Sequence, residues 1–547
     1  MITTTGMARF AFIASASGLV AGCASPVSAA PTPQAVDSSM IVPMAARDSE
    51  AARIRAFGVT VPDGGVVLER PWDPPYTRRS FVVPQSWFRH QSDSVRADAL
   101  DRDLPVLHAL MERAYGGWGA AAHRGWNWDK WFADWHEMLR AHHGATIATA
   151  DAFAPMKQYI AFQLDNHTTI PLGVRFGSGS RTSLIDGLPK GRCTEVRMTD
   201  GNSVALDWND PAQRLRHAVR WNAALTRLDS VAYLSMPASR GLPASIRCGG
   251  GWVNATPVWP FGDVAKSTRA ELAARDSVIR ALSGAEHDEP NFVMLEPTIA
   301  YLRLPTFSEA NGRLIEQRIE HWPKRTGNER VLIVDLRDND GGNATLTPFA
   351  GWVDTRGVSR ALNAHRHEGA SCLYHALRWG YTTISTLGIR PPASPSFTQR
   401  LQTISDDVFG QSAADCPSEF KDSKSGWDYR QRVMQPPGVA NGRLRLMLLV
   451  NNGCGSDCEA ELIMLSSLAE TVVVGSNTFG VAQFIQPGYS VLPHTRLPFR
   501  IALGTSDVYG DGRSFDGYGL DVDIVLATRA DESRESILAL AHYLGGA

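Results

Sequence analysis

Four apolar runs in the C-terminal half constrain the fold of this chain more than any other feature. They read TIAYLRLP, RVLIVDLR, RLRLMLLV and ETVVVG, and each is apolar enough to form a strand buried on both faces. Helix-like segments alternate with them, since DCEAELIMLSSLAE follows the third run and ESILALAHYLGG ends the chain. This alternation indicates an α/β domain, which we assign to residues 291–547. Within it, the long, polar, Pro-containing span 351–443 is typical of an insertion and could overhang a site.

The preceding residues divide by composition and periodicity. Residues 24–95 are a tether and N-terminal extension, rich at first in Ala, Pro and Ser. Helical periodicity predicts a small bundle over 96–170, in which aromatic residues at this spacing form a core. Three apolar stripes define it: Leu104, Leu107, Met111 and Tyr115; Trp128, Trp131, Phe132, Trp135 and Leu139; Phe153, Met156, Ile160 and Leu164. Residues 171–290 are predicted to be a mostly β middle domain, with a helix near 212–228.

The N-terminus indicates export. Arg9 precedes a short apolar stretch that ends in small residues, which is the pattern of a secretory signal. The VAGC sequence resembles the lipobox of bacterial lipoproteins, which implies a signal over 1–23 and a lipid on Cys23. The alternative is cleavage near Ala30, which would leave a soluble exported protein. We expect a protein of the bacterial cell envelope that faces the periplasm and meets the membrane only through a lipid anchor, since no later apolar run of about 20 residues predicts a membrane span.

The composition argues against two classes of partner. A formal net charge of −2 gives no electrostatic case for binding nucleic acid or an anionic membrane surface. No cofactor is predicted, because GSGS at 177–180 lacks the lysine of a phosphate loop. The histidines at 142–143 and 365–368 lack further metal ligands, and nothing in the sequence specifies an oligomeric state.

The cysteines predict disulfides. Six remain when Cys23 is set aside, and an even number in an exported chain favours pairing. Proximity in the sequence favours three pairs: Cys193–Cys248, Cys372–Cys416 and Cys454–Cys458. The last would staple the turn that carries Ser456. Zinc is the alternative for a C-x-x-x-C pair, but no second ligand pair lies at a suitable spacing, so no metal is predicted.

Two glycine-rich turns carry the candidate chemistry. Ser456 lies between an apolar run and a helix-like segment in LLVNNGCGSDCEAEL, where the first helical N–H groups can stabilise an oxyanion. Gly341 and Gly342, in VLIVDLRDNDGGN, allow a backbone N–H to approach a substrate closely. Each turn also has an ordinary interpretation, Ser456 as a helix N-cap and DNDGG as a plain turn. Asp335 and Arg337 are predicted to be structural, as an ion pair or a strand-end anchor.

Together these motifs resemble the tail-specific, or C-terminal-processing, serine peptidases. The elements YLRLPTF, VLIVDLRDNDGG, LLVNNGCGSDCEAEL, VVVGSNTFG, LPHTRLPF and FDGYGLDVDI follow one another in the family's order. The resemblance implies a crotonase/ClpP-like α/β catalytic domain that cleaves peptide bonds in peptide or protein substrates. It also implies individual roles: Ser456 as nucleophile, Gly341, Gly342 and the Asp457 amide at the oxyanion hole, and Glu459 and Thr478 in support.

The sequence departs from the family at Val481. Most such peptidases carry a lysine base directly after TFG, and valine cannot accept a proton. A branch of the superfamily resembling the tricorn core protease instead uses serine with histidine and an acidic residue. That resemblance implies that His167, in LDNHTT, is the general base, with an unperturbed pKa of about 6.5. It implies that Asp516, in DGYGL, supports the imidazolium directly or through Asn166.

Two functions therefore compete. The first is an exported serine peptidase that forms an acyl-enzyme on Ser456 with His167 as general base. The second is a non-catalytic ligand- or peptide-binding protein on the same fold. Loss of the family lysine favours binding, whereas retention of Ser456, the Gly341–Gly342 turn and His167 favours catalysis. The middle domain could also be a divergent PDZ module that adds a peptide strand to a sheet edge, although PLGVRFGSGSR contains no clear carboxylate-binding loop.

Overall fold

The structure is a computed structural model. It describes the two glycine-rich turns that carry Gly341 and Ser456, and the loop that contains His167. It describes two short strands, β1 (Gly58–Thr60) and β2 (Val66–Leu68), and then the ranges 93–171, 179–342 and 444–546. Gaps within these ranges are 207–214, 238–239, 259–268, 285–288, 309–310, 313, 316–323, 325, 467–469, 493, 496 and 506–514. Four predictions lie outside the described residues: the 1–23 signal with Cys23, most of 24–95, the insertion 351–443, and the Cys372–Cys416 pair.

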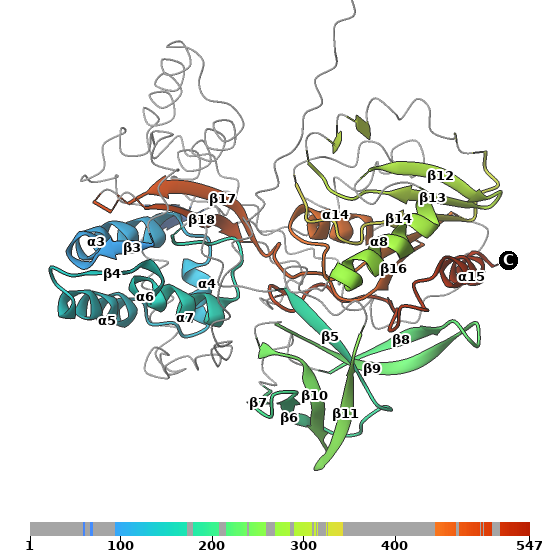
Figure 1. Cartoon of the computed structure of the whole chain (residues 1–547), viewed down its shortest axis with the longest axis horizontal. Coiled ribbons are helices and arrows are strands. Elements are labelled where there is room, and N and C mark those ends of the chain that lie inside the picture. Colours follow the sequence, from blue (N-terminus) through green and yellow to red (C-terminus); the bar gives the residue numbers. More distant parts are fainter. Residues whose placement is uncertain are drawn as a thin grey trace, which may run out of the picture. The chain divides into compact units, whose positions relative to one another are not determined.

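Residues 93–171 contain the helices of the predicted bundle, grouped together in Figure 1. Its helices are α3 (Ala97–Ala114), α4 (Trp118–His123), α5 (Trp128–Ala141), α6 (Thr149–Ala152) and α7 (Ala154–Gln163), and its strands β3 (Ser94–Arg96) and β4 (Thr146–Ala148) pair antiparallel. Every stripe residue is buried, which confirms that the aromatic residues form a core. The same core contains Phe484 and Phe499, from the antiparallel hairpin of β17 (Phe484–Val491) and β18 (Pro498–Thr505). The C-terminal region thus contributes to the core of the helical part.

Parallel strands form the centre of the α/β part. The four predicted runs become β13 (Ile299–Arg303), β14 (Val331–Asp335), β15 (Arg445–Val450) and β16 (Thr471–Gly475). They pair in parallel in this order and are buried along their whole length, as predicted. Strand β12 (Asn291–Glu296) pairs antiparallel with β13, and β19 (Ile524–Val525) pairs in parallel with β16. The chain is therefore of mixed α/β class.

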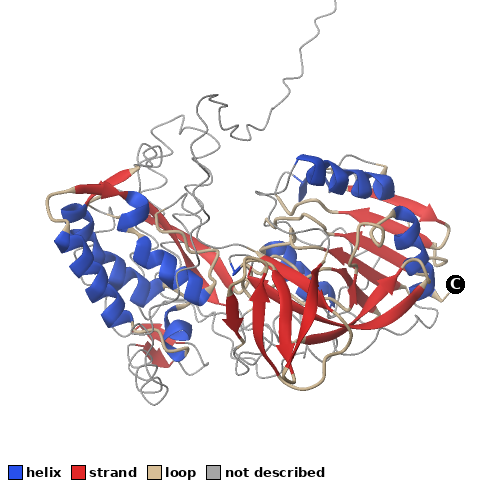
Figure 2. Cartoon of the chain, turned by 60° about the horizontal axis from the view of Figure 1, so that its bottom comes forward, coloured by secondary structure: helices blue, strands red, loops and turns tan. Residues whose placement is uncertain are grey.

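A second set of strands extends the same sheet. Its members are β5 (Ser180–Ile185), β6 (Cys193–Met198), β7 (Ser203–Ala205), β8 (Arg216–Asn222), β9 (Arg227–Pro237), β10 (Pro243–Cys248) and β11 (Gly251–Pro257). Strand β8 pairs in parallel with β19, so that 13 strands of the described residues form one mixed sheet. Among the described residues no helix lies between β5 and β11 (Figure 2).

The predicted helix near 212–228 is wrong. This stretch contains β8 and the start of β9, joined by a turn in which Thr226 has a positive φ. Val219 and Trp221 are buried while their neighbours are more exposed, a period of two that suits a strand and not a helix. The pairing of β8 with both β9 and β19 outweighs the local helical propensity.

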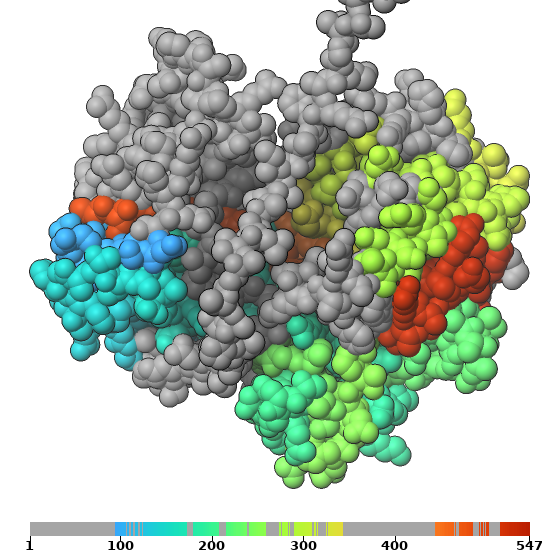
Figure 3. All heavy atoms as spheres, in the orientation of Figure 1, coloured from blue at the N-terminus to red at the C-terminus, as the bar shows by residue number. Residues whose placement is uncertain are grey.

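Helices cover both faces of the parallel strands. Leu462 of α14 (Asp457–Ser466) belongs to the apolar cluster on one face. Leu540 of α15 (Arg534–Gly545) and Leu282 of α8 (Arg269–Ser283) belong to the cluster on the other face. Helices α8 (yellow-green) and α15 (red) lie side by side in Figure 3. Nη1 of Arg534 donates to the Leu282 carbonyl over 3.0 Å. The α14 and α15 segments confirm the two helices predicted in this part.

A buried ion cluster anchors the carboxyl end of β14, next to the glycine turn. Nη2 of Arg337 lies 2.6 Å from Oδ2 of Asp335, and its Nη1 lies 3.0 Å from Oε2 of Glu532. Burial alone would raise the pKa of Asp335, but the guanidinium groups of Arg337 and Arg303 lower this pKa to about 2. The predicted structural ion pair is confirmed, and it holds the strand end from which the DNDGG turn begins.

Candidate active site

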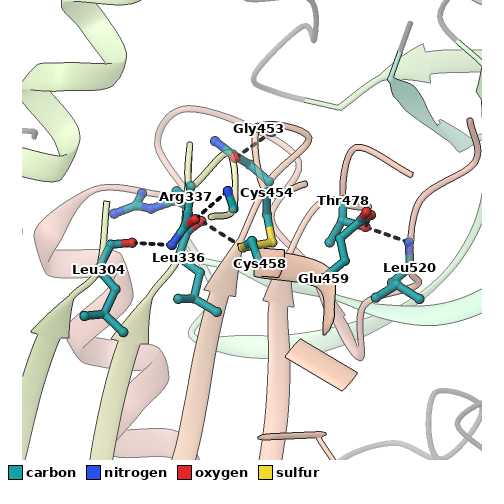
Figure 4. Close-up of a disulfide and its surroundings, with 12 residues drawn as sticks. Leu304, Leu336, Arg337, Gly453, Cys454, Cys458, Glu459, Thr478 and Leu520 are labelled. Atoms are coloured by element: carbon teal, nitrogen blue, oxygen red, sulfur yellow. Dashed lines mark hydrogen bonds between the residues drawn. A yellow bond between two sulfur atoms is a disulfide. The ribbon is translucent and has the colours of Figure 1, made fainter. Parts of the chain in front are cut away.

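Ser456 lies in the turn between β15 and helix α14, at the carboxyl end of a central parallel strand. Its φ is +57°, a left-handed conformation that non-glycine residues rarely adopt and that surrounding structure must enforce. The Cys454–Cys458 disulfide flanks it (Figure 4), and Cys193–Cys248 joins β6 to β10. Two of the three predicted pairs are therefore at disulfide distance, and one of them staples the serine turn.

Asn451 ties the serine turn to the end of β14. Its side-chain oxygen accepts hydrogen bonds from the amides of Asp338 and Gly453, both over 2.9 Å. Its side-chain nitrogen donates to Oδ1 of Asp338 over 3.0 Å. The Gly455 amide donates to the Asn339 carbonyl over 3.0 Å, so the turns after β14 and β15 form one hydrogen-bonded unit.

Gly341 and Gly342 bring the second turn against the serine. A Cβ on Gly341, whose φ is +93°, would lie 2.7 Å from the Asp457 nitrogen and 2.9 Å from Cβ of Ser456. Only glycine allows this approach. The Gly341 amide, however, donates to Oδ1 of Asn339 over 2.9 Å, so this predicted oxyanion donor is already engaged. The Gly342 amide donates to no acceptor among the described residues.

The structure brings His167 to Ser456, with Nε2 of the imidazole 3.3 Å from the serine Oγ. His167 lies in the loop that follows α7, and two interactions hold this loop. The Asp165 carboxylate accepts the His167 amide over 2.8 Å, in an Asx-type turn. Two residues beyond the histidine, Thr169 forms an antiparallel bridge with Arg500 of β18. Loop and hairpin together set the position of the imidazole.

The environment of His167 favours the neutral imidazole. Burial and then the positive charge of Arg500 lower the pKa of His167 to about 4, although the Phe484 backbone acts to raise it. Nδ1 of the imidazole is buried and forms no hydrogen bond of normal geometry. At neutral pH the ring can therefore accept a proton from Ser456 at Nε2.

The Asp516 carboxylate forms no hydrogen bond with the His167 imidazole, which differs from the predicted direct contact. Its Oδ1 accepts the Gln483 amide over 2.8 Å, and Oδ2 is buried without a partner. Burial, and after it the nearby charges of Glu459 and Asp165, raise the pKa of Asp516 well above its usual range. Nor does Asn166 link the two residues, because its side-chain nitrogen donates to the Gly480 carbonyl over 3.3 Å.

Glu459 holds the TFG segment against the first turn of α14. Its carboxylate accepts the Thr478 hydroxyl, the Gly480 amide at 2.7 Å and the Val481 amide at 2.8 Å (Figure 4 shows Thr478). Burial raises the pKa of Glu459 to about 7 despite these hydrogen bonds. A Cβ on Gly455 would lie 3.1 Å from Cγ1 of Val481, so the valine packs directly against the serine turn. Its backbone amide, not a lysine ammonium, faces the glutamate.

Sequence reasoning missed three residues that shape this site: Asp165, Arg500 and Asn451. Asp165 had a local signal, because Asp two residues before a loop histidine is typical of an Asx turn. Arg500 and Asn451 had none, since both act on segments distant in the sequence. Among the described residues no group of three or more His, Cys, Asp or Glu side chains is arranged to hold a metal ion. No described helix is long and apolar enough to cross a membrane.

Comparison with known proteins yields structural neighbours. No protein-family profile and no curated protein matches the chain. Mature CPAF is 13% identical with a TM-score of 0.38, over 82% of this chain and 96% of that chain. A putative peptidase from Parabacteroides merdae ATCC 43184 is 13% identical with a TM-score of 0.36, over 81% and 96%. The photosystem II D1 C-terminal processing protease is 12% identical with a TM-score of 0.30, over 81% and 97%. These TM-scores are too low to establish a shared fold, so the case for function rests on the geometry of the site.

Proposed function

We propose that the protein is a serine peptidase that forms an acyl-enzyme on Ser456, with His167 as general base. The observation that carries the proposal is the 3.3 Å contact between Nε2 of His167 and Oγ of Ser456. Two independently held segments converge on this contact, and the serine has the left-handed backbone that exposes a nucleophile at a strand–helix turn. The contact is slightly long for a hydrogen bond, as is common for such pairs without substrate.

In the proposed reaction, Oγ of Ser456 attacks the carbonyl carbon of the peptide bond while Nε2 of His167 takes the hydroxyl proton. The histidine then gives that proton to the departing amine as the C–N bond breaks, which leaves an ester on the serine. Water attacks the ester, with its proton passing to His167 and then to the serine oxygen. The acid product leaves and both residues return to their starting states.

Backbone amides would stabilise the oxyanion of each tetrahedral intermediate. We assign this role to Gly342 and Asp457, because the Gly341 amide donates to Asn339. Gly341 contributes through its conformation, which lets the two turns approach. Asp457 is the first residue of α14, where the helix dipole favours negative charge.

Asp516 would act on His167 through the chain segment between them. The Gln483 amide, which donates to Oδ1 over 2.8 Å, and the Phe484 backbone both lower the pKa of Asp516, and the Phe484 backbone also raises the pKa of His167. Nδ1 of His167 and Oδ2 of Asp516 are both buried without a partner. The imidazolium formed during the reaction has a proton on Nδ1, and the Phe484 backbone favours this charged form.

We also propose that the protein is exported and lipid-anchored at Cys23 on the periplasmic side of a bacterial envelope. The signal-like N-terminus supports this location, and so do two disulfides, which persist in oxidising compartments.

Hydrolysis of a peptide library, with new termini mapped by mass spectrometry, tests the proposed function. We expect the unmodified chain to cleave peptides, Ser456→Ala to abolish cleavage, and His167→Ala to lower it by at least about 100-fold. His136→Ala is a matched control, since His136 pairs with Asp101 on the helical part. Failure of the folded, unmodified chain to cleave any peptide would overturn the proposal in favour of ligand binding on the same fold.

A further inference from the structure

Arg500 is a half-buried guanidinium beside the candidate base, and it has no carboxylate partner among the described residues. Its Nη2 donates to the Asn166 carbonyl over 3.3 Å and to Oγ1 of Thr169 over 3.0 Å, while its Nε is buried without a hydrogen bond. By contrast, the buried arginines Arg337 and Arg445 each face a carboxylate, at 2.6 and 2.8 Å. Removing a guanidinium from water without a counter-charge costs free energy. Arg500 is therefore a candidate group for binding an anion.

The position of Arg500 is fixed relative to His167. Arg500 and Thr169 exchange both backbone hydrogen bonds, over 2.7 and 2.9 Å. The two acceptors of Nη2, on Asn166 and Thr169, lie on either side of the histidine in the chain. The guanidinium is close enough for its charge to lower the pKa of His167. Arg500 is therefore held against the loop that carries the candidate base.

An unneutralised guanidinium here works against the reaction. The general base must become an imidazolium, and a neighbouring positive charge disfavours that form. A carboxylate bound to Arg500 would cancel the charge at the moment when substrate is present. The free edge of a guanidinium matches a carboxylate in geometry and binds it with charge-assisted hydrogen bonds.

We propose that Arg500 binds a carboxylate of the substrate and makes the site selective for peptides that carry one near the scissile bond. The inference rests on the proposed peptidase function and names its substrate class. The carboxylate comes either from a peptide C-terminus or from an Asp or Glu side chain, and both present the same chemistry to the guanidinium. Arg500 is thus a specificity-determining residue.

Binding tests this inference without requiring catalysis. Immobilised Ser456→Ala protein is exposed to a peptide library that is either unmodified or has every carboxyl group amidated, and captured peptides are counted by mass spectrometry. We expect unmodified peptides to be favoured by about 10- to 100-fold, as for a charge-assisted hydrogen-bonded pair. Adding Arg500→Gln should remove the preference, whereas adding Arg247→Gln, which removes an exposed charge on β10, should retain it. Equal capture of both libraries, or a preference that survives Arg500→Gln, would overturn the inference.

Cleavage by the unmodified chain separates the two carboxylate sources and the two proposals. Cuts at a constant distance from the peptide end would identify the C-terminal carboxylate, and Asp or Glu enriched at one subsite would identify a side chain. Arg500→Gln protein should retain the circular dichroism spectrum of the unmodified chain, which shows that it is folded. Arg247→Gln protein should react with a neutral fluorophosphonate as fast as the unmodified chain, which shows that Ser456 is active. Absence of that reaction in the unmodified chain refutes the peptidase, whereas cleavage indifferent to carboxylates refutes only the role of Arg500.

Discussion

At the scale of single residues, backbone conformation and local charge decide what the site can do. Ser456 has a φ of +57° and Gly341 a φ of +93°, and a Cβ added to Gly341 would lie 2.9 Å from Cβ of Ser456. Nearby, burial and Arg500 keep His167 neutral. None of these properties follows from residue identity, since each depends on neighbours that the fold supplies.

The pH dependence of kcat/KM should report the lowered pKa of His167. A base acts only when unprotonated, so activity is present above the pKa of about 4 and is lost as pH falls through it. Arg500 on β18 is the charged group that acts on the buried ring, and the Asp165 carboxylate accepts the His167 backbone amide. Arg500→Gln removes one of the two causes of the shift and should move the acid limb to higher pH, measured with a neutral substrate. A limb near pH 6.5 in the unmodified chain would contradict this assignment.

Gly341→Ala should slow the reaction of Ser456 while leaving the protein folded. The new Cβ would meet the Asp457 nitrogen at 2.7 Å, so the two turns must separate. We expect fluorophosphonate labelling of Ser456 to slow by at least about 100-fold. Gly144→Ala is the matched control, because Gly144 has a similar φ of +79° and no atom near the added Cβ. It should cost about 1 kcal/mol of unfolding free energy and leave labelling unchanged. Equal labelling of both variants would refute the role of the Gly341 turn.

At the scale of elements, the site depends on connections between segments that are far apart in sequence. The Cys454–Cys458 disulfide joins the serine turn to the first turn of α14, and Asn451 joins that turn to the end of β14. The β17–β18 hairpin crosses to the helical core and holds the His167 loop through Arg500. Different sets of contacts therefore position Ser456 and His167.

Removing the two disulfides should separate stability from reactivity. The double change Cys454→Ala and Cys458→Ala opens a short loop and should lower the unfolding free energy by about 2 kcal/mol. It should also slow labelling of Ser456, because the serine turn is released. Cys193→Ala with Cys248→Ala opens a loop of sequence separation 55 and should cost more, about 4 kcal/mol, without slowing labelling. The prediction is contradicted if Ser456 is labelled more slowly in the Cys193/Cys248 variant than in the Cys454/Cys458 variant.

The strands and the main turns could be predicted from sequence because their signals are local. Runs such as VLIVD are apolar throughout, and the stripes of the bundle repeat at the helical period. The strand within 212–228 could not be predicted in this way, because β8 pairs with β19, whose residues lie about 300 positions later in the chain. Arg500 and the Asp516–Gln483 hydrogen bond were hidden for the same reason. The pairing of His167 with Ser456 was accessible only through resemblance to a family.

At the scale of the whole molecule, one sheet joins the middle strands to the α/β core. The joint is the parallel pairing of β8 with β19, and Trp221 of β8 is buried beside it. The indole Nε1 donates to Oγ of Ser536 on α15 over 3.0 Å, and its ring lies 5.8 Å from that of Tyr543. The C-terminal helix therefore packs against both sets of strands.

Trp221→Ala should consequently destabilise the described fold as a unit. Deleting a fully buried indole costs about 3–5 kcal/mol, measured as a lower midpoint of denaturant unfolding. Trp252→Ala is the control, since Trp252 on β11 is 38% exposed and its ring lies under the Arg197 guanidinium, and it should cost no more than about 1 kcal/mol. Similar denaturant midpoints for the two variants would show that packing at the β8–β19 pairing does not couple the middle strands to the α/β core.

The most direct test of the central claim is covalent labelling by a fluorophosphonate, followed by mapping of the modified peptide. We expect the unmodified chain to be labelled on Ser456, with labelling abolished in Ser456→Ala and slowed by at least about 100-fold in His167→Ala. Labelling lost only in Ser456→Ala would mean that another group activates the serine. A folded, unmodified chain that takes no label at all would contradict the account of this site as a serine peptidase.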